Sequence, residues 1–195
     1  VSKSLRGLFA KAGVDASVLD ADDRTLVRET PDGKLRFLLL KPDDVPTYVE
    51  YGAADLGVVG RDVLLERRYD LYQPLDLGIG RCRMVVAAEV GRGPLPDVPR
   101  VATKYARIAT EHFAAKGVQV EIIYVQGSVE LAPIVGLADL IVDLVETGST
   151  LKENHLEVVE EVCTISSVVV ANRAAFKLRA DDVSPLVAAL AKVIA

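Results

Sequence analysis

Short apolar runs rich in β-branched residues alternate along this 195-residue chain with segments of helical pattern. Such alternation predicts an α/β fold with largely parallel strands. The first half of the chain has strand-like runs at Leu35–Leu40, Asp55–Val59, Leu71–Leu77 and Arg83–Ala88. A helix is predicted between the first two of these runs, because Pro42 suits a first helical turn and Gly52 ends the pattern.

The second half repeats the alternation after an irregular loop, Glu89–Pro99, that holds two glycines and three prolines. Strands are predicted at Val101–Thr103, Val118–Val125, Leu140–Val145 and, as one long run, Glu157–Ala171. The predicted helices are Ala106–Lys116, a short helix capped by Ser128, and a C-terminal helix with Ser184 as its cap and Pro185 in its first turn.

Only a short segment with the glycines Gly78 and Gly80 separates two of the strand-like runs, so the chain is expected to cross between two lobes near residue 80. The long run that ends at Ala171 would carry the chain back near residue 163. We therefore predict one lobe made of residues 1–80 plus 164–195 and a second made of residues 81–163, with a cleft between them. Cys82 and Cys163 would both fall at these crossings.

The composition excludes several classes of protein. The 23 Lys and Arg residues are outnumbered by 28 Asp and Glu, a net charge of −5, which argues against a general nucleic-acid binder. Two cysteines 81 residues apart and two histidines, His112 and His155, lack the spacing of a structural zinc site or of a catalytic triad. No apolar run approaches the roughly 20 residues that span a bilayer, so the prediction is a cytoplasmic protein with reduced thiols.

The most informative segment is Leu140–Leu151, in which an apolar strand leads through a turn of small residues into a helix start. Backbone N–H groups of Thr147, Gly148, Ser149 and Thr150 would converge on one anion there, and the three hydroxyls would add donors. Glycine at position 148 lets the backbone approach the anion closely. Phosphate suits this arrangement, although the segment is neither a Walker loop nor a dinucleotide fingerprint.

Two carboxylates accompany the loop, because Asp143 lies four residues before Thr147 and Glu146 lies directly before it. Acidic groups beside a phosphate are repulsive unless ribose hydroxyls or Mg²⁺ engage them. The pattern Asp-x-x-x-Thr-Gly-x-Thr therefore describes a ribose-5-phosphate site. It is equally compatible with an aspartate in a buried strand followed by a well-capped helix.

A longer stretch, Glu130–Leu151, resembles the signature of the ATP phosphoribosyltransferases that open histidine biosynthesis. Four further stretches agree with that family: Asp44–Tyr48, Asp55–Gly60, Cys82-Arg83 and Ala102–Tyr105. The resemblance covers nearly the whole chain. It implies a type II periplasmic-binding-protein fold, with two lobes joined by two crossover strands.

The resemblance also implies a reaction: transfer of phosphoribose from phosphoribosyl pyrophosphate to N1 of ATP, with pyrophosphate released and Mg²⁺ required. The loop Glu146–Thr150 would hold the 5-phosphate. Asp143 or Glu146 would hold the ribose hydroxyls and favour the cationic sugar of the transition state. These two carboxylates are the predicted catalytic groups, and Mg²⁺ would be held mainly by substrate phosphates.

Further site residues are expected because both substrates are polyanions and the chain is acidic. Lys41, Arg83 and Lys104 are candidates for neutralising charge on ATP or on pyrophosphate. Tyr105 could stack on adenine or could cover the start of the following helix, and both alternatives are open. Glu130 is either a charge at a helix terminus or a partner of the phosphate loop.

Some features depart from the family pattern. Its members usually begin with a strand ending in a Pro-Lys-Gly-Arg-like segment, whereas this chain starts at Val1-Ser-Lys-Ser, and Lys41 stands where an arginine is usual. The chain ends at Ala195, which leaves no room for the regulatory domain of the long form. The resemblance therefore implies the short form, a homodimer within a hetero-oligomer whose other subunit resembles a histidyl-tRNA synthetase.

Other classes of protein remain as alternatives. A two-lobed solute-binding or anion-binding protein without catalysis would share the architecture, since a fold alone does not decide function. A phosphoribosyltransferase for another nucleobase would keep Asp143–Thr150 but not the agreement around Glu130 and Thr103. A subunit that only scaffolds its synthetase-like partner is the third. Replacing Asp143 by asparagine separates them, because only an enzyme would lose transfer while phosphate binding persists.

Overall fold

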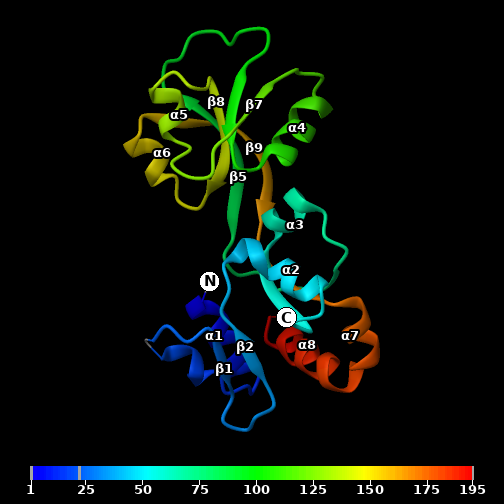
Figure 1. Ribbon diagram of the computed structural model, residues 1–195. Helices are drawn as coiled ribbons and strands as arrows, with labels where there is room; N and C mark the ends of the chain where they lie inside the picture. The colour runs from blue at the N-terminus through cyan, green and yellow to red at the C-terminus, as the bar shows by residue number, and fades with distance from the viewer. Residues whose placement is uncertain (1, 22, 195) are drawn as a thin grey trace. The chain divides into compact units, whose positions relative to one another are not determined.

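The longest apolar runs form the central strands of two separate sheets in the computed structural model, which describes residues 2–21 and 23–194. The chain divides into two compact units (Figure 1). Unit 1 comprises Val1–Leu64, Arg68–Gly80 and Ser166–Ala195, and unit 2 comprises Leu65–Arg67 and Arg81–Ile165. Val1 and Ala195, on which the expectations about the chain ends rest, lie outside the described residues.

Unit 1 is built on a three-stranded sheet in the order β3-β10-β4. Its central strand β10 (Ser167–Ala171) is buried along its whole length. It pairs antiparallel with β3 (Leu56–Gly60) and with β4 (Tyr72–Asp76). Val168 and Val170 pack into one apolar core and Val169 into another, so both faces of this sheet are covered.

Helices surround this small sheet. They are α1 (Ser2–Lys11), α2 (Val45–Glu50), α3 (Arg61–Arg67), α7 (Arg173–Leu178) and α8 (Ala180–Ile194), with short 3-10 helices η1 (Ser17–Asp20) and η2 (Pro42–Asp44). Close packing of α2 depends on Gly57 of β3. A Cβ there would lie 2.7 Å from a methyl group of Val45 and 2.8 Å from one of Val49.

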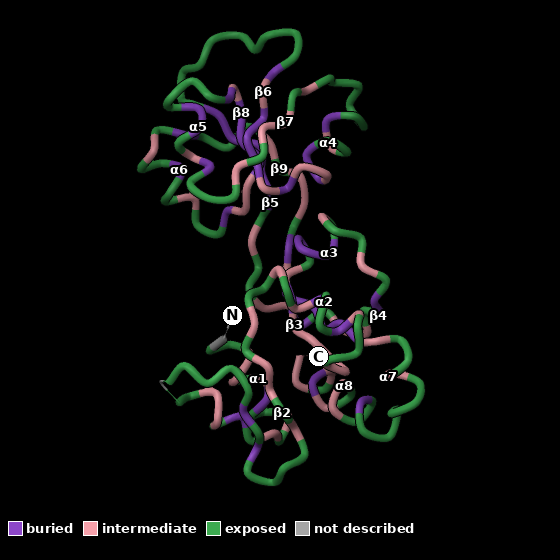
Figure 2. The backbone as a smooth tube through the Cα atoms, viewed as in Figure 1, coloured by how far each residue is buried: buried purple, intermediate pink, exposed green. Residues whose placement is uncertain are grey.

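Unit 2 contains a five-stranded sheet in the order β7-β6-β8-β5-β9. The strands are β5 (Cys82–Glu89), β6 (Arg100–Thr103), β7 (Glu121–Tyr124), β8 (Leu140–Val145) and β9 (Leu156–Ile165). β6 pairs parallel with both β7 and β8, whereas β5 pairs antiparallel with both β8 and β9. Strands β5 and β8 carry much of the buried chain of this unit (Figure 2).

The two faces of the unit 2 sheet have separate cores. On one face, Tyr105, Ile108 and Phe113 from α4 (Ala106–Ala115) and its N-cap pack with Met84 and Val142. On the other face, residues of the short helices α5 (Leu131–Ile134) and α6 (Ser149–Glu153) pack with Val85 and Ile141. The chain therefore leaves β6 over one face toward β7 and returns over the other face to β8.

The expectation of largely parallel strands was wrong. The described strands of unit 1 pair only antiparallel, and unit 2 has a mixed sheet. The physical reason lies in the long strands β5 and β9, which bring the chain into unit 2 and out of it again. They run in opposite directions beside one another, so helical crossovers and parallel pairing are confined to β6, β7 and β8.

Several boundaries also differ from prediction. The strand expected at residues 35–40 is β2 (Arg36–Leu38), which pairs antiparallel with β1 (Val27–Glu29) in a separate hairpin. The strand expected at residues 118–125 is only β7. The run expected at residues 157–171 is broken at Ser166 into β9 and β10. The loop at residues 89–99 and the helix at residues 106–116 match prediction closely.

Two helix caps were wrongly assigned. Ser128 has a left-handed backbone with φ 49° and accepts a hydrogen bond at its carbonyl from Leu131 N, while Glu130 occupies the N-cap position of α5. The C-terminal helix α8 begins at Ala180, so Ser184 and Pro185 lie inside it. It follows α7, whose N-cap is Asn172, with a side chain that accepts from two backbone N–H groups.

The cysteines are diagonal neighbours on adjacent strands. Cys82 of β5 lies opposite Ile165, and Cys163 of β9 lies opposite Met84, so both side chains share one face of the sheet. Both are reduced thiols, and each is partly buried. None of the helices formed by the described residues is long and apolar enough to cross a bilayer.

Candidate functional site

The connections of unit 2 create a switch point between β6 and β8. These two strands are parallel, but the chain leaves β6 toward α4 on one face and enters β8 from α5 on the other. Open α/β sheets bind ligands at such a point, beside the carboxyl ends of the strands. The residues at that edge are Thr103 at the end of β6, Lys104 directly after it, and the loop that begins at Glu146 after β8.

The loop after β8 has the conformation that its small residues predict. Gly148 has a left-handed backbone with φ 81° and forms the N-cap of α6. Thr147 and Ser149 hold one another through a hydroxyl contact of 3.1 Å, and Ser149 N also donates to Thr147 Oγ1 at 3.4 Å. Thr147, Ser149 and Thr150 are all exposed, while Leu151 is buried and anchors the loop in the core.

The two carboxylates of the loop differ in setting. Asp143 is half-buried within β8, opposite Val85 of β5, and its Oδ1 accepts from Leu144 N at 2.8 Å. Glu146 is exposed at the start of the loop. One carboxylate is therefore fixed by the sheet, whereas the other lies in solvent beside the hydroxyls.

The carboxylates of the loop can be compared with the ligands that Mg²⁺ requires. Within residues 2–21 and 23–194 no three His, Cys, Asp or Glu side chains come together as a ready-made metal site. Mg²⁺ commonly uses one or two carboxylates together with substrate phosphates. Asp143 and Glu146 fit that mode of binding.

The segment after β6 brings a positive charge to the same edge of the sheet. Lys104 is partly exposed, and its Nζ lies 4.7 Å from the centre of the Tyr105 ring. Tyr105 itself is 3% exposed and belongs to the core beneath α4. These contacts favour the alternative in which Tyr105 covers the start of the helix, and its ring also supports Lys104 by a cation–π contact.

The other predicted residues have settings of their own. Arg83 on β5 is exposed and pairs with Glu161 of β9 at 3.3 Å. Glu130 is partly buried, and its side chain makes no capping hydrogen bond to α5. Lys41 is exposed in unit 1, directly before η2.

The N-terminus of α4 has an acidic partner that the sequence did not indicate. Both carboxylate oxygens of Glu66 accept from Arg107 N, at 3.0 and 3.2 Å, and one accepts from Ile108 N at 3.1 Å. Glu66 lies 41 residues from Arg107 in the sequence, so no local capping motif points to this contact. These first N–H groups of α4 are consequently bonded within unit 2.

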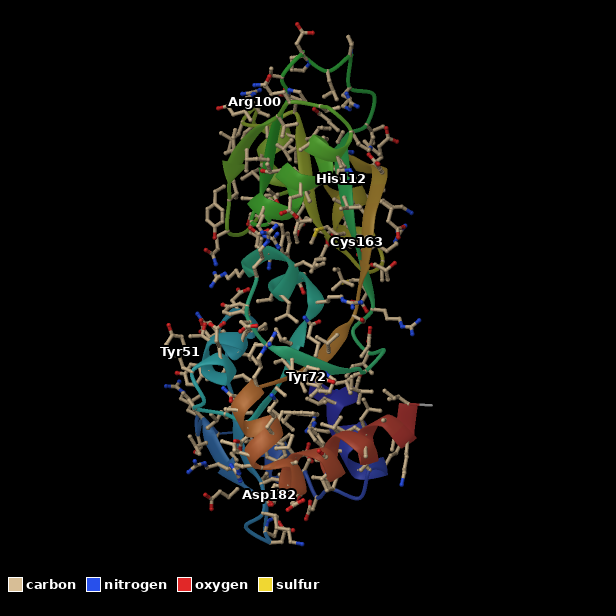
Figure 3. All side chains as sticks on the ribbon, turned by 90° about the vertical axis from the view of Figure 1, so that its right-hand side faces the viewer. Tyr51, Tyr72, Arg100, His112, Cys163 and Asp182 are labelled. Carbon is tan, nitrogen blue, oxygen red and sulfur yellow. The ribbon has the colours of Figure 1, made fainter. Side chains whose placement is uncertain are left out.

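A second contact missed by sequence reasoning secures the opposite end of β6 and β8. The carboxylate of Asp139 accepts from Arg100 N at 2.8 Å and from the Arg100 guanidinium at 3.3 Å, while Arg100 also donates to Gly136 O at 3.1 Å (Figure 3). The Arg100 side chain and its backbone N–H hold the pKa of Asp139 below its ordinary value. Asp139 thus fixes the strands beneath the candidate site.

The fold is that of an α/β protein whose candidate anion-binding loop lies at a sheet switch point. Comparison with known proteins is more specific. The family model for ATP phosphoribosyltransferase matches residues 41–192. The ATP phosphoribosyltransferase of Sorangium cellulosum is 64% identical over 191 residues, covering 96% of this chain and 88% of the relative. That of Syntrophotalea carbinolica is 50% identical over 193 residues, with 96% and 88% covered.

Solved structures agree with these relatives. The ATP phosphoribosyl transferase (HisG:HisZ) complex from Thermotoga maritima contains a chain that superposes with a TM-score of 0.83 and 38% identity, covering 98% of this chain and 92% of that one. A substrate-binding protein of an amino acid ABC transporter gives a TM-score of 0.60 at 16% identity, over 98% and 78% of the two chains, which shows the fold alone. The chain belongs to the ATP phosphoribosyltransferase family. It is a transferase of the first step of histidine biosynthesis.

Proposed function

We propose that this chain transfers phosphoribose from phosphoribosyl pyrophosphate to N1 of ATP, and that the loop after β8 binds the 5-phosphate. The observation that carries the proposal is the left-handed Gly148 between the linked hydroxyls of Thr147 and Ser149, at the carboxyl end of a parallel strand. Such a loop turns backbone N–H groups and hydroxyls toward one anion. Membership of the family supports the choice of substrates.

The roles of the carboxylates follow from their settings. Departure of pyrophosphate leaves positive charge on the ribose ring, and a fixed carboxylate nearby stabilises that charge without reorganising. Asp143, held on β8 by its pairing with Val85 of β5, suits this task and the binding of ribose hydroxyls. Glu146, exposed beside the hydroxyls, suits a more adaptable contact to ribose or to a cation.

Catalysis of this kind rests on positioning and charge, because no covalent nucleophile is required. Mg²⁺, held by substrate phosphates together with Asp143 or Glu146, would neutralise part of the pyrophosphate charge as it leaves. Lys104, steadied on Tyr105, would add a positive charge at the end of β6. Arg83 and Lys41 are further candidates for contacts to ATP.

The proposal includes a partner and a location. The Thermotoga maritima relative was solved as a HisG:HisZ complex. We propose that this chain likewise works as a homodimer in a hetero-oligomer with a subunit resembling a histidyl-tRNA synthetase. We also propose that the reaction takes place in the cytoplasm.

Calorimetric titration with phosphoribosyl pyrophosphate and Mg²⁺ tests the loop directly. Thr147→Val removes a hydroxyl that contacts Ser149, so we expect the affinity to fall at least about tenfold, the loss of roughly one charge-assisted hydrogen bond. Thr164→Val is the matched control, because Thr164 is exposed on β9 and its backbone suits valine. Unchanged binding by Thr147→Val would exclude this loop as the phosphate site.

The product tests the reaction. In the presence of its partner subunit the chain should convert ATP and phosphoribosyl pyrophosphate to a product of the mass of phosphoribosyl-ATP. Asp143→Asn should lower the rate by about 100-fold or more, since a charge that acts in the transition state is lost. Binding of inorganic phosphate should persist in this variant. Binding without any turnover in the wild-type complex would favour the solute-binding alternative.

A further inference from the structure

The end of β6 carries a buried threonine whose hydroxyl and carbonyl make hydrogen bonds toward β8 and toward the residue after β7. Thr103 is completely buried, and its Oγ1 donates to Val142 O at 2.7 Å while accepting from Tyr105 N at 2.8 Å. Its own carbonyl accepts from Val125 N, directly after β7. Every hydrogen-bonding atom of the Thr103 side chain is therefore used inside unit 2.

The Thr103 hydroxyl makes the next hydrogen bond to β8 at the point where the backbone pairing between β6 and β8 ends. The register of the two strands covers Val101 opposite Leu140 and Ala102 opposite Ile141. Thr103 still pairs with Tyr124 of β7, but toward β8 the bond to the next residue, Val142, comes from its side chain. The two strands thus separate at Thr103, and one hydroxyl bridges the opening.

The residue after Val142 is Asp143. The Val142 carbonyl belongs to the peptide group that joins these two residues, so its hydrogen bond fixes the orientation of that planar group. The direction in which Asp143 projects its carboxylate depends on the same peptide plane. On the opposite side, Asp143 is held by pairing with Val85 of β5.

We propose that Thr103 is a positioning residue for Asp143: its buried hydroxyl fixes the Val142–Asp143 peptide and thereby aims the carboxylate at the ribose. The catalytic part of this inference rests on the proposed function. Through Tyr105 N, the same hydroxyl also fixes the start of the segment that carries Lys104. Thr103 Oγ1 therefore sets the spacing between the segment after β6, which carries Lys104, and the end of β8, which carries Asp143.

The test compares two substitutions that separate shape from hydrogen bonding. Thr103→Val keeps the branched shape but leaves Val142 O and Tyr105 N without this partner in a buried place, so the peptide must turn toward another one. Thr103→Ser keeps the hydroxyl and loses only a methyl group. We expect kcat to fall about 10-fold to 100-fold in Thr103→Val, with KM changed by less than about threefold, and to recover in Thr103→Ser.

Thr30→Val supplies the matched control for loss of a buried hydroxyl. Thr30 is 5% exposed in unit 1, donates to Asp32 at 2.6 Å and accepts from Leu35 N at 3.1 Å. This variant should lower the melting temperature without changing kcat. If Thr103→Val also lowers only the melting temperature and leaves kcat unchanged, the Thr103 hydroxyl is merely structural and the inference is overturned.

A second measurement keeps the inference independent of the reaction. The NMR chemical shifts of the Val142 carbonyl and of the Asp143 amide and carboxyl carbons should move in Thr103→Val and return in Thr103→Ser. If the wild-type complex has no transferase activity while these shifts behave as expected, the positioning stands and the proposed function fails. If neither the Asp143 shifts nor kcat differ from wild type in Thr103→Val, the positioning role is refuted.

Discussion

Single residues of the site owe their placement to two different causes. The hydroxyls of the loop lie together because they are adjacent in sequence, so their contact could be predicted from the pattern around Gly148. Thr103 and Val142 lie 39 residues apart, and their contact depends on the register of two strands. The sequence alone contains no signal for that register. Similarly, the sequence leaves two alternatives open for Tyr105, and the packing of α4 decides between them by burying its ring.

Gly148 permits a prediction at this scale. A Cβ at position 148 would lie 3.7 Å from a Val145 methyl group, an ordinary contact, so a substitution there meets backbone strain and no clash. Because φ is 81° at this position, Gly148→Ala should either lower the free energy of unfolding by about 1–2 kcal/mol or change the conformation of the loop. We expect calorimetry to show an affinity for phosphoribosyl pyrophosphate weakened about tenfold or more.

Gly127→Ala is the control for this variant. Gly127 is exposed, and a Cβ there would meet no atom within 4 Å. Its affinity for phosphoribosyl pyrophosphate should equal that of the wild type. Equal affinities for both alanine variants would mean that the loop does not need its left-handed residue to bind the substrate.

At the scale of elements, hydrophobic patterning predicted most strands and helices but not how they pair. The runs that became β5, β6 and β8 are clear in the sequence, because burial on both faces demands continuous apolar residues. The predicted strand direction was wrong, since alternation of strands with helices predicts parallel pairing even where a strand such as β5 pairs antiparallel with both of its neighbours. The cap of α8 was misplaced because Ser184 and Pro185 suit a helix start as well as they fit inside this helix.

The contact between Arg100 and Asp139 predicts how the stability of unit 2 depends on pH. Because the Arg100 side chain and backbone lower the pKa of Asp139, the stabilisation is present above the unfolded value of about 3.9 and is lost as the pH falls through the folded value. Asp139→Asn should lower the melting temperature at pH 7 by about 2–4 °C, the effect of losing roughly one net hydrogen bond in a chain of this size.

The difference between Asp139→Asn and the wild type should shrink when melting is measured near pH 3, below the unfolded pKa of about 3.9, because the unfolded carboxylate there binds a proton that the folded state, with its lowered pKa, holds less strongly. Asp97→Asn, a change at an exposed position of the loop between β5 and β6, should leave the melting temperature unchanged at both pH values. A difference for Asp139→Asn that is as large at pH 3 as at pH 7 would show that its carboxylate charge does not contribute.

At the scale of the whole molecule, each unit has its own apolar core on both faces of its own sheet. The proposed phosphoribosyl loop, Asp143 and Thr103 all belong to unit 2. A ligand that binds only the folded state raises the free energy of unfolding of the part that it contacts, by about 2.7 kcal/mol at 100 times its dissociation constant. The free energy of local opening in the unit that does not contact the ligand depends on that unit's own core and should stay the same.

Hydrogen–deuterium exchange can therefore locate the bound substrate. With phosphoribosyl pyrophosphate and Mg²⁺ present, we expect exchange to slow most at residues 146–152 and at the carboxyl ends of β6 and β8, because their N–H groups bond to the phosphate or lie in strands fixed by it. Thr147→Val at the same ligand concentration should lose this protection, and Thr164→Val should keep it. Protection confined to unit 1 would contradict the assignment, since the anion would then be held by residues such as Lys41 and not by the loop after β8.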